Sequence, residues 1–370
     1  MGSPYMTRSV HSLSYEASFR DTVNSINQAV ENALPSKKGY DCVRVLILRW
    51  ANDDLGLADI EKALLEFFSV KYHFATDSIL ISSLSMADAL NGIREKIGKL
   101  IKYDTTTSLF IVVYEGHSSI TDKGFTLYGS RRYTPAIPWL MIEGELTRIR
   151  HADKLLILDS CFSTAAAIEG GNNEYLAASS SESQASGCVE RSFTRRFLDL
   201  LANIDCPEIT VTQIHAKLVA QANKPNSKQG YTPVHVKSTE KPSITLCPLH
   251  KIRRDVAGLR RTGELADGKV LISILLEGKP SIPKIEEWNR LLMSSIPDAV
   301  ADIKIEAVFE STSSTCLVSM PVAVWDMLKR NDAYAFVAYV ESHNLLLHQP
   351  NPSNILEGSA GNVQLPTREK

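Results

Sequence analysis

The sequence lacks any apolar run close to the roughly 20 residues that a membrane-spanning helix needs. Its first residues also show no charged stretch followed by an apolar core, the pattern of a secretion signal. A net charge of −2 gives no strong field toward nucleic acid or an anionic membrane. We therefore expect a cytoplasmic protein with neither a nucleic-acid nor a membrane partner.

Paired cysteines are missing as well. The six cysteines lie far apart and form no CxxC pair, which argues against both a disulfide framework and a zinc site. Acidic residues are scattered and do not form the loop of an EF-hand, so calcium activation is neither supported nor excluded. We expect no metal site and no resident cofactor. The cysteines are Cys42, Cys161, Cys188, Cys206, Cys247 and Cys316.

The composition is that of a globular protein, with 44% hydrophobic and 22% charged residues, and a length of 370 residues suggests two domains. Within residues 39–240, apolar strands alternate with amphipathic helices, which is typical of an α/β fold with a mostly parallel sheet covered on both faces. The predicted strands are 43–48, 78–81, 108–114, 154–159, 174–178 and 234–236. The predicted helices are 59–68, 87–101, 139–149, 193–201 and 211–222.

A second unit follows residues 241–267, a stretch rich in Pro, Lys and Arg that we interpret as a linker. Residues 268–350 have the order βαββαβ of a ferredoxin-like α+β domain. No cluster of catalytic residue types is visible there, so we expect an accessory role and a candidate surface for self-association. Residues 1–38 form an N-terminal segment with a helix near 19–34, and residues 351–370 form a flexible tail.

Reactive side chains follow two of the predicted strands. Tyr114-Glu115-Gly116-His117 ends the strand 108–114, and Asp159-Ser160-Cys161 ends the strand 154–159. Because the carboxyl ends of parallel strands meet at one edge of a sheet, we expect His117 and Cys161 to lie close together. An imidazole raises the thiolate fraction of a neighbouring thiol and can later protonate a leaving amine. The pair predicts a cysteine peptidase.

These motifs resemble those of the caspases, in which a His lies about 50 residues before a Cys that follows a buried strand. Tyr-x-Gly-His and Asp-Ser-Cys-x-Ser are more similar to metacaspases than to animal caspases, which carry Gln-Ala-Cys. The resemblance covers residues 40–240 and implies an endopeptidase that cuts proteins or peptides after Arg or Lys, with a part in programmed cell death. It implies Asp159 in the S1 pocket, Asp59 or else Asp54 as a second S1 acid, and the backbone N–H of Ser118 in the oxyanion hole.

Two positions depart from that family. Ser118 follows the His where the family has Gly, and Thr164 replaces a Gly after the Cys. Between Cys161 and Glu190 there is also no Lys or Arg at which a peptidase specific for basic residues could cut itself. These features favour the alternative, a catalytically weak or inactive caspase-like adaptor in a cell-death or stress pathway. A serine hydrolase is disfavoured because there is no GxSxG motif.

Overall fold

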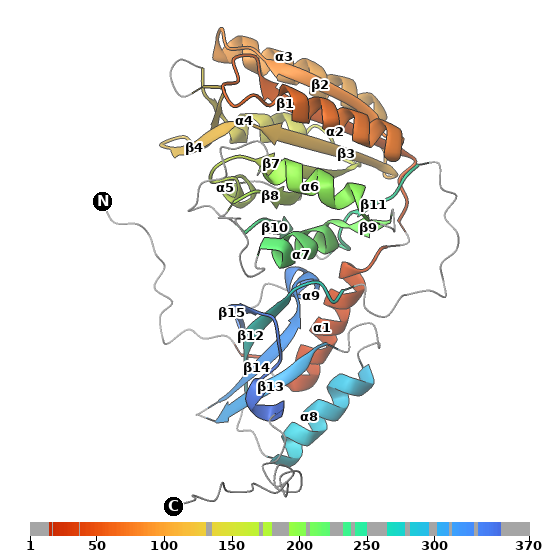
Figure 1. Ribbon diagram of the computed structural model, residues 1–370, viewed down its shortest axis with the longest axis vertical. Helices are drawn as coiled ribbons and strands as arrows, with labels where there is room; N and C mark the ends of the chain where they lie inside the picture. Colours follow the sequence, from red (N-terminus) through yellow and green to blue (C-terminus); the bar gives the residue numbers. More distant parts are fainter. Residues whose placement is uncertain are drawn as a thin grey trace, which may run out of the picture.

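The computed structural model describes residues 15–348 apart from several short segments and two longer ones. The residues left out within that range are 17, 37, 131–134, 170–172, 180–191, 205–207, 223–231, 238–240, 250–264, 278–281, 296–301, 311–312 and 329–331. The predicted tail and most of the predicted linker therefore lie outside the described residues. Two units are stacked along the long axis of the molecule (Figure 1).

The first unit is built on a six-stranded sheet with the order β10-β8-β7-β3-β1-β2. All neighbouring strands are parallel except β10, which runs antiparallel to β8 at one edge. This confirms the predicted mainly parallel α/β sheet. The strands are β1 (Cys42–Trp50), β2 (Ala75–Ile81), β3 (Ser108–Glu115), β7 (Asp153–Asp159), β8 (Glu174–Ala177) and β10 (Val234–Lys237).

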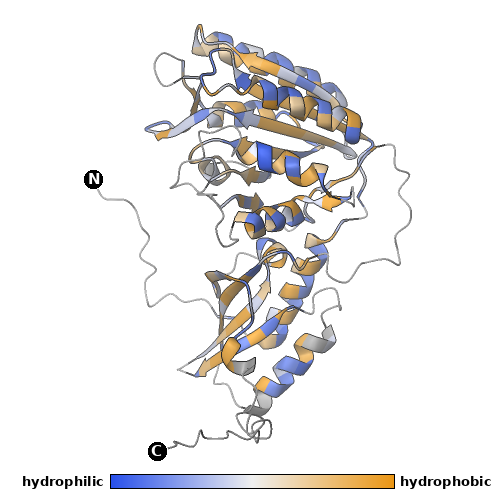
Figure 2. Ribbon diagram, in the orientation of Figure 1, coloured by the Kyte–Doolittle hydropathy of each residue, from blue (hydrophilic) through white to orange (hydrophobic). Residues whose placement is uncertain are grey.

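Helices cover both faces of this sheet because the strands bury alternate side chains on opposite sides. Val45, Ile111 and Ile157 belong to the core under α2, α6 and α7, whereas Leu46 and Val112 belong to the core under α3, α4 and α5. Figure 2 shows the resulting hydrophobic strands beneath helices with mixed faces. The helices are α2 (Ala58–Lys71), α3 (Met86–Leu100), α4 (Trp139–Leu146), α5 (Thr164–Glu169), α6 (Phe193–Ala202) and α7 (Val211–Ala222).

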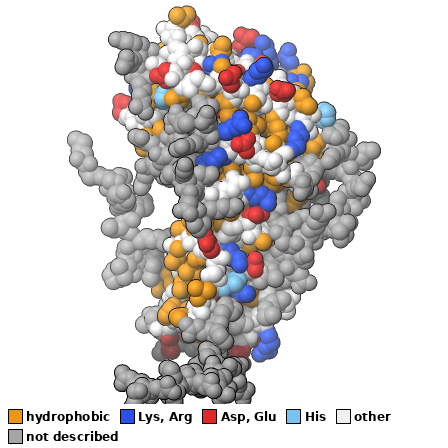
Figure 3. Space-filling model, viewed as in Figure 1, with side chains coloured by type: hydrophobic (Ala, Val, Ile, Leu, Met, Phe, Trp, Pro, Cys, Tyr) orange, Lys and Arg blue, Asp and Glu red, His pale blue; other side chains and the backbone are white. Residues whose placement is uncertain are grey.

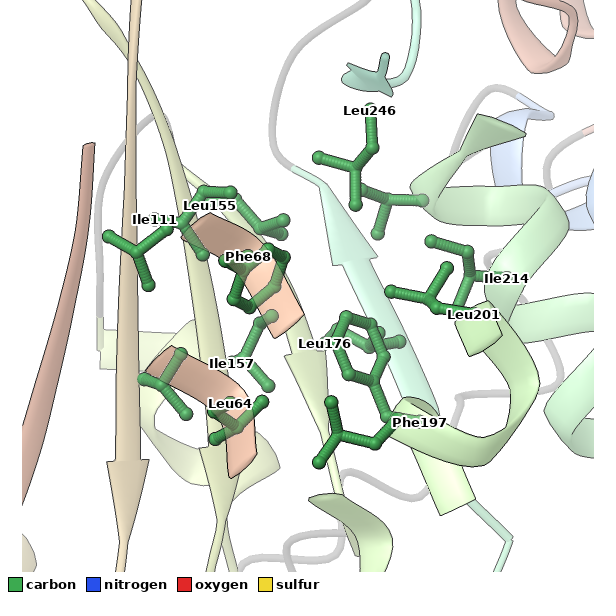
Figure 4. Close-up of a cluster of buried hydrophobic side chains, with 14 of the residues drawn as sticks. Leu64, Phe68, Ile111, Leu155, Ile157, Leu176, Phe197, Leu201, Ile214 and Leu246 are labelled. Atoms are coloured by element: carbon green, nitrogen blue, oxygen red, sulfur yellow. The ribbon is translucent and has the colours of Figure 1, made fainter. Parts of the chain in front are cut away.

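The first of these cores holds three helices against the sheet. Leu64 and Phe68 of α2 lie over the sheet side chains, and Phe197 of α6 closes the cluster on another side (Figure 4). Fully burying one such side chain stabilises the fold by about 1.5–3 kcal/mol. The core therefore fixes the strands firmly, and with them the loops at their carboxyl ends.

The C-terminal unit has the predicted βαββαβ order and an antiparallel sheet with the order β13-β14-β12-β15. The predicted ferredoxin-like arrangement is confirmed, because each helix connects two strands that are separated by one antiparallel neighbour. The elements are β12 (Lys269–Leu276), α8 (Ile282–Ser295), β13 (Lys304–Glu310), β14 (Ser314–Pro321), α9 (Val322–Met327) and β15 (Tyr334–Val340).

The N-terminal helix α1 (Phe19–Ala33) belongs to the core of the C-terminal unit. Phe19 stacks on Trp288 of α8, with ring centroids 4.8 Å apart, and Glu16 forms a parallel bridge with Leu276. Its N-cap Ser18 accepts a hydrogen bond from the Asp21 N–H, which fixes where the helix begins. Helical periodicity predicts this helix from sequence but says nothing about which unit it packs on.

Two small sheets are absent from the sequence-based prediction. A three-stranded sheet, β4 (His117–Thr121), β5 (Gly124–Tyr128) and β6 (Ile137–Pro138), extends the chain beyond β3. A two-stranded antiparallel sheet is formed by β9 (Ile209–Thr210) and β11 (Thr245–Leu246). The buried part of the first unit therefore extends as far as Leu246. These strands have only two to five residues, too short for a periodic pattern to reveal.

Charged side chains of both signs are scattered over the upper unit in Figure 3, and hydrophobic side chains gather on the lower, C-terminal unit. The edge strand β15 contributes the exposed Phe336, Val337 and Tyr339. An apolar edge strand can pair with another chain, so self-association through this unit stays a prediction. In the part of the chain that the structure covers, no helix has both the length and the apolarity to cross a membrane.

Candidate active site

The register between β3 and β7 brings His117 and Cys161 to the same edge of the sheet. Glu115 pairs with Asp159 across the two parallel strands. His117 and Cys161 each lie two residues beyond that pair. The Gly116 N–H donates to the Asp159 carbonyl at 3.3 Å, and the Ser118 hydroxyl donates to the Cys161 carbonyl. The two loops are therefore joined directly by hydrogen bonds.

The Tyr-x-Gly-His motif has a local physical explanation. The Tyr114 hydroxyl folds back and donates to the His117 carbonyl at 2.6 Å. A Cβ atom on Gly116 would lie 2.8 Å from that hydroxyl, and Gly116 has φ +150°, which favours glycine. The tyrosine and the glycine thus fix the backbone at the point where the chain leaves β3 and presents His117.

The imidazole of His117 is held on two sides. Its Nε2 lies 2.6 Å from Asp54 Oδ1, and its ring stacks on Tyr128 with centroids 5.5 Å apart and planes 10° apart. Asp53 shapes the loop that carries Asp54, since its carboxylate accepts the N–H groups of Leu55 at 3.0 Å and Leu57 at 2.8 Å. With Nε2 engaged by a carboxylate, Nδ1 is the ring nitrogen that remains for a thiol.

Cys161 lies in a tight turn between β7 and α5, and its exposure is intermediate. The next residue, Phe162, has φ +58°, a left-handed conformation that costs a non-glycine residue about 1–2 kcal/mol. Packing of its ring against the core offsets that strain. Backbone strain of this kind is concentrated at functional sites.

The far side of the Cys161 turn is tied to the chain that follows β8. The Thr164 hydroxyl donates to the Ser179 carbonyl at 2.6 Å, and the Ser179 hydroxyl donates to the Ser160 carbonyl at 3.2 Å. Ser118 holds the near side, as described above. The two residues that replace family glycines, Ser118 and Thr164, therefore both bond to backbone carbonyls that brace the turn.

Asp159 lies beneath this turn and is partly buried. One of its oxygens, Oδ2, accepts the Thr194 N–H at the start of α6 at 2.8 Å. Burial raises the pKa of the Asp159 carboxyl, and the hydrogen bonds from Thr194 and the charge of Arg196 offset part of that rise. The helix N-terminus thus helps to keep a negative charge where the resemblance places an S1 acid.

Glu115 is a second carboxyl next to Asp159, and it is 1% exposed. Neither of its oxygens has a hydrogen-bond partner among the described residues. Burial, together with the charge of Asp159, raises the pKa of Glu115 to about 8. Since Asp159 has a backbone donor and Glu115 has none, Glu115 is the member of the pair that is protonated at neutral pH.

Glu115→Gln is expected to remove a loss of stability that wild type shows above pH 6. The unfolded carboxyl ionises near 4.5 and the folded one near 8, so the folded state binds more protons and its stability falls as pH rises between these values. The slope is about 1.4 kcal/mol per pH unit, so wild type should lose about 2–3 kcal/mol from pH 6 to pH 8 relative to the variant. Urea denaturation at both pH values measures the difference.

The matched control for that measurement is Glu66→Gln, which changes an exposed carboxyl on α2. It should follow the wild-type pH profile. A Glu115→Gln profile parallel to wild type would show that Glu115 is ionised in the folded protein throughout this range.

The structure places the remaining predicted site residues as follows. Asp59 is exposed in the first turn of α2, where a negative charge interacts favourably with the helix dipole. The Asp54 carboxylate contacts the imidazole of His117. Ser118 is 3% exposed and its carbonyl accepts the Tyr128 hydroxyl at 3.2 Å. The roles predicted for these residues and for Asp159 stay predictions.

Several residues around the site were not predicted. They are Tyr114, Tyr128, Ser179 and Thr194, which hold the loops that carry His117, Cys161 and Asp159. Tyr114 was visible within the Tyr-x-Gly-His motif. Tyr128 lies on β5, Ser179 follows β8 and Thr194 lies on α6, and no spacing in the sequence points to them.

No protein-family model matches this chain, and no curated protein matches its sequence. Among solved structures, the Drosophila initiator caspase Dronc aligns with a TM-score of 0.39 and 13% identity, over 55% of this chain and 81% of that one. Caspase-1 from Spodoptera frugiperda aligns with a TM-score of 0.36 and 11% identity, over 56% of this chain and 91% of that one. The structure of pro-sf-caspase-1 aligns with a TM-score of 0.33 and 11% identity, over 54% of this chain and 93% of that one. The likeness is distant and concerns the fold, so the chemistry follows from the site's own residues.

Proposed function

We propose that this protein is a cysteine endopeptidase that cleaves after Arg or Lys, with Cys161 as nucleophile and His117 as general base. The observation that carries the proposal is the register of β3 and β7, which sets the two residues at equal distances beyond the Glu115–Asp159 pair. The hydrogen bond from Ser118 to the Cys161 carbonyl joins the two loops at that edge. A thiol and an imidazole at one sheet edge are the parts that acyl transfer needs.

The reaction would begin with transfer of the Cys161 thiol proton to His117 Nδ1. The thiolate attacks the peptide carbonyl, and the backbone N–H groups of Ser118 and Cys161 stabilise the oxyanion. The imidazolium then gives its proton to the leaving amine, which departs and leaves an acyl group on Cys161. Water, deprotonated by His117, releases that acyl group and restores the thiol.

Asp54 has a different role in this proposal from the S1 position that the resemblance implies. Its carboxylate accepts the Nε2 proton of His117 at 2.6 Å, which selects the tautomer with a basic Nδ1 and stabilises the imidazolium that forms. Asp54 is therefore proposed as a positioning residue. Asp159 is proposed to hold the P1 cation, since one of its oxygens is fixed by Thr194.

The direct test is covalent labelling by a peptide chloromethyl ketone with Arg at P1. We expect stoichiometric label on Cys161, located by peptide mass spectrometry, and much slower labelling by the same ketone with Asp at P1. Failure of both ketones to label Cys161 would contradict the proposal and favour a non-catalytic adaptor. Equal labelling by both would contradict only the basic specificity.

Two variants in the same assay separate the roles around the thiol. His117→Ala should nearly abolish labelling, because the thiol loses its base. Asp54→Asn should slow labelling by up to about 10⁴-fold, because an amide at this position favours the tautomer that carries its proton on Nδ1. It should also shift the pH dependence of labelling, which a purely structural defect would not do. An unchanged rate and pH profile in Asp54→Asn would rule out the positioning role.

A further inference from the structure

Two histidines and an aspartate meet where α9 of the C-terminal unit packs on α7 and β10 of the first unit. His215 Nδ1 lies 2.5 Å from Asp326 Oδ2, and His235 Nδ1 lies 3.3 Å from the same oxygen. The side chains of His215, His235 and Asp326 are 5%, 0% and 7% exposed, respectively. Their donor atoms all lie within 4.8 Å of one another.

The other nitrogen of each imidazole already has an acceptor. His215 Nε2 lies 2.9 Å from the Pro233 carbonyl, and His235 Nε2 lies 2.9 Å from Glu174 Oε1. Glu174 also accepts hydrogen bonds from the Ser243 hydroxyl at 2.6 Å, the Ile244 N–H at 2.9 Å and the Lys237 ammonium group at 2.9 Å, so its oxygens act as acceptors. A carbonyl and an ionised carboxylate can only accept, so each Nε2 carries a proton.

A neutral imidazole with its proton on Nε2 presents a lone pair at Nδ1. Both Nδ1 atoms here face Asp326, so two nitrogen lone pairs and a carboxylate oxygen converge on one buried point. In addition, His235 Nδ1 is buried and makes no hydrogen bond of acceptable geometry with any residue that the structure describes. A positive charge, either extra protons or a metal ion, is needed at this point.

We propose that His215, His235 and Asp326 bind a divalent transition-metal ion of the zinc class. Imidazole nitrogen with a carboxylate oxygen is a donor set that suits zinc. Ligands about 2.0 Å from a tetrahedral zinc ion lie about 3.3 Å apart, which is the His235–Asp326 separation seen here. The shorter His215–Asp326 contact opens when the ion enters.

The surroundings of the cluster match those of metal-binding histidines. Such histidines donate their second ring N–H to a carboxylate or to a backbone carbonyl, as His235 does to Glu174 and His215 does to Pro233. Three protein ligands leave the fourth position to water. No spacing pattern reveals this site, because its ligands lie on three separate elements, at residues 215, 235 and 326.

A metal ion here ties the C-terminal unit to the first unit. Asp326 is the only one of the three ligands that comes from the C-terminal unit, on α9, and the Thr212 hydroxyl of α7 lies 3.1 Å from its Oδ2. Ala216 and Val219 of α7 pack into the core of the C-terminal unit beside this polar contact. Binding an ion at this junction stabilises the packing of the two units against each other.

The rival state is a cluster in which both rings are doubly protonated. In that state a proton on each Nδ1 would face Asp326 Oδ2, which lies 2.5 Å from His215 and 3.3 Å from His235. A metal ion must displace these protons, so its affinity falls as pH falls. Binding is therefore measured at pH 7.5 and again at pH 6.

The experiment uses the full chain carrying Cys161→Ala, so that zinc bound to the Cys161–His117 pair is not counted. After chelator treatment, equilibrium dialysis with Zn²⁺ should give one bound ion per chain and a higher melting temperature. Co²⁺ should give visible absorption of a site with nitrogen ligands. Asp326→Asn and His215→Gln should each lower Zn²⁺ affinity at least 100-fold.

The matched control is His343→Gln, which changes a histidine paired with Glu306 at 2.8 Å within the C-terminal unit and should keep full zinc binding. If circular dichroism shows that Asp326→Asn does not fold, His215→Gln decides the test alone. A chain that binds no Zn²⁺, or equal Zn²⁺ affinity in the folded variants, would overturn the proposal and identify the cluster as protonated ion pairs.

Discussion

Replacing Cys161 with alanine is expected to lower kcat/KM for a fluorogenic peptide with Arg at P1 by about 10⁴-fold or more. Alanine removes the sulfur that would form the acyl intermediate, while the oxyanion donors and the pocket remain. The turn itself should survive, because its braces run from Ser118 and Ser179 to backbone carbonyls and do not involve the thiol. Circular dichroism and the melting temperature should match those of wild type.

The control is Cys42→Ala, which lies at the amino ends of the strands of the same sheet. Cys42 pairs with Ser108 at the amino end of β3, whereas the candidate site lies at the carboxyl end. Its exposure is intermediate, like that of Cys161, so loss of a thiol as such is matched. Peptide hydrolysis that survives in Cys161→Ala but not in Cys42→Ala would place the reaction elsewhere and refute the proposed nucleophile.

Much of the fold could be predicted because its strands are buried on both faces. A fully buried parallel strand is a continuous apolar run, and β3 is buried over its whole length from Ser108 to Glu115. Such runs, separated by amphipathic helices, allow few topologies other than an open parallel sheet. The short strands β4–β6 have no such run, and the antiparallel β10 at the edge looks no different in sequence from a parallel strand.

The candidate site was predictable to the extent that it follows strand ends. His117 and Cys161 each come directly after a buried strand, so the rule for parallel sheets is enough to bring them together. Asp54 could not be assigned to His117 in this way. It lies in a loop shaped by hydrogen bonds from Leu55 and Leu57 to Asp53, and the direction of a side chain in such a loop has no periodic signal.

Contacts between the two units could not be predicted from the sequence. Residues 15–34 precede the first unit, yet α1 fills the core of the C-terminal one. Likewise, His215, His235 and Asp326 meet only because α9 packs on α7 and β10. Amphipathic patterns state that a face must be covered, but they do not state by which partner.

Asp159→Asn is expected to lower kcat/KM for an Arg-P1 peptide by about 10²- to 10³-fold, since breaking one side of a buried charge pair costs about 2–5 kcal/mol. The same peptide with a neutral P1 residue should lose far less. Thr194 donates its N–H to Asp159 Oδ2 and so holds the carboxylate in place for the substrate cation. An Asn keeps the shape but carries no charge to pair with guanidinium.

Asp159→Asn should also change the pH dependence of peptide hydrolysis. Burial raises the pKa of the Asp159 carboxyl, so in wild type the hydrolysis of the Arg-P1 peptide should fall on acidification at a higher pH than an ordinary aspartate would cause. That acid limb should be missing in Asp159→Asn. Asp199→Asn, an exposed change on the same helix as Thr194, is the matched control and should behave like wild type. Equal losses for Arg and neutral P1 peptides would show that Asp159 supports the fold of the turn and does not select the substrate.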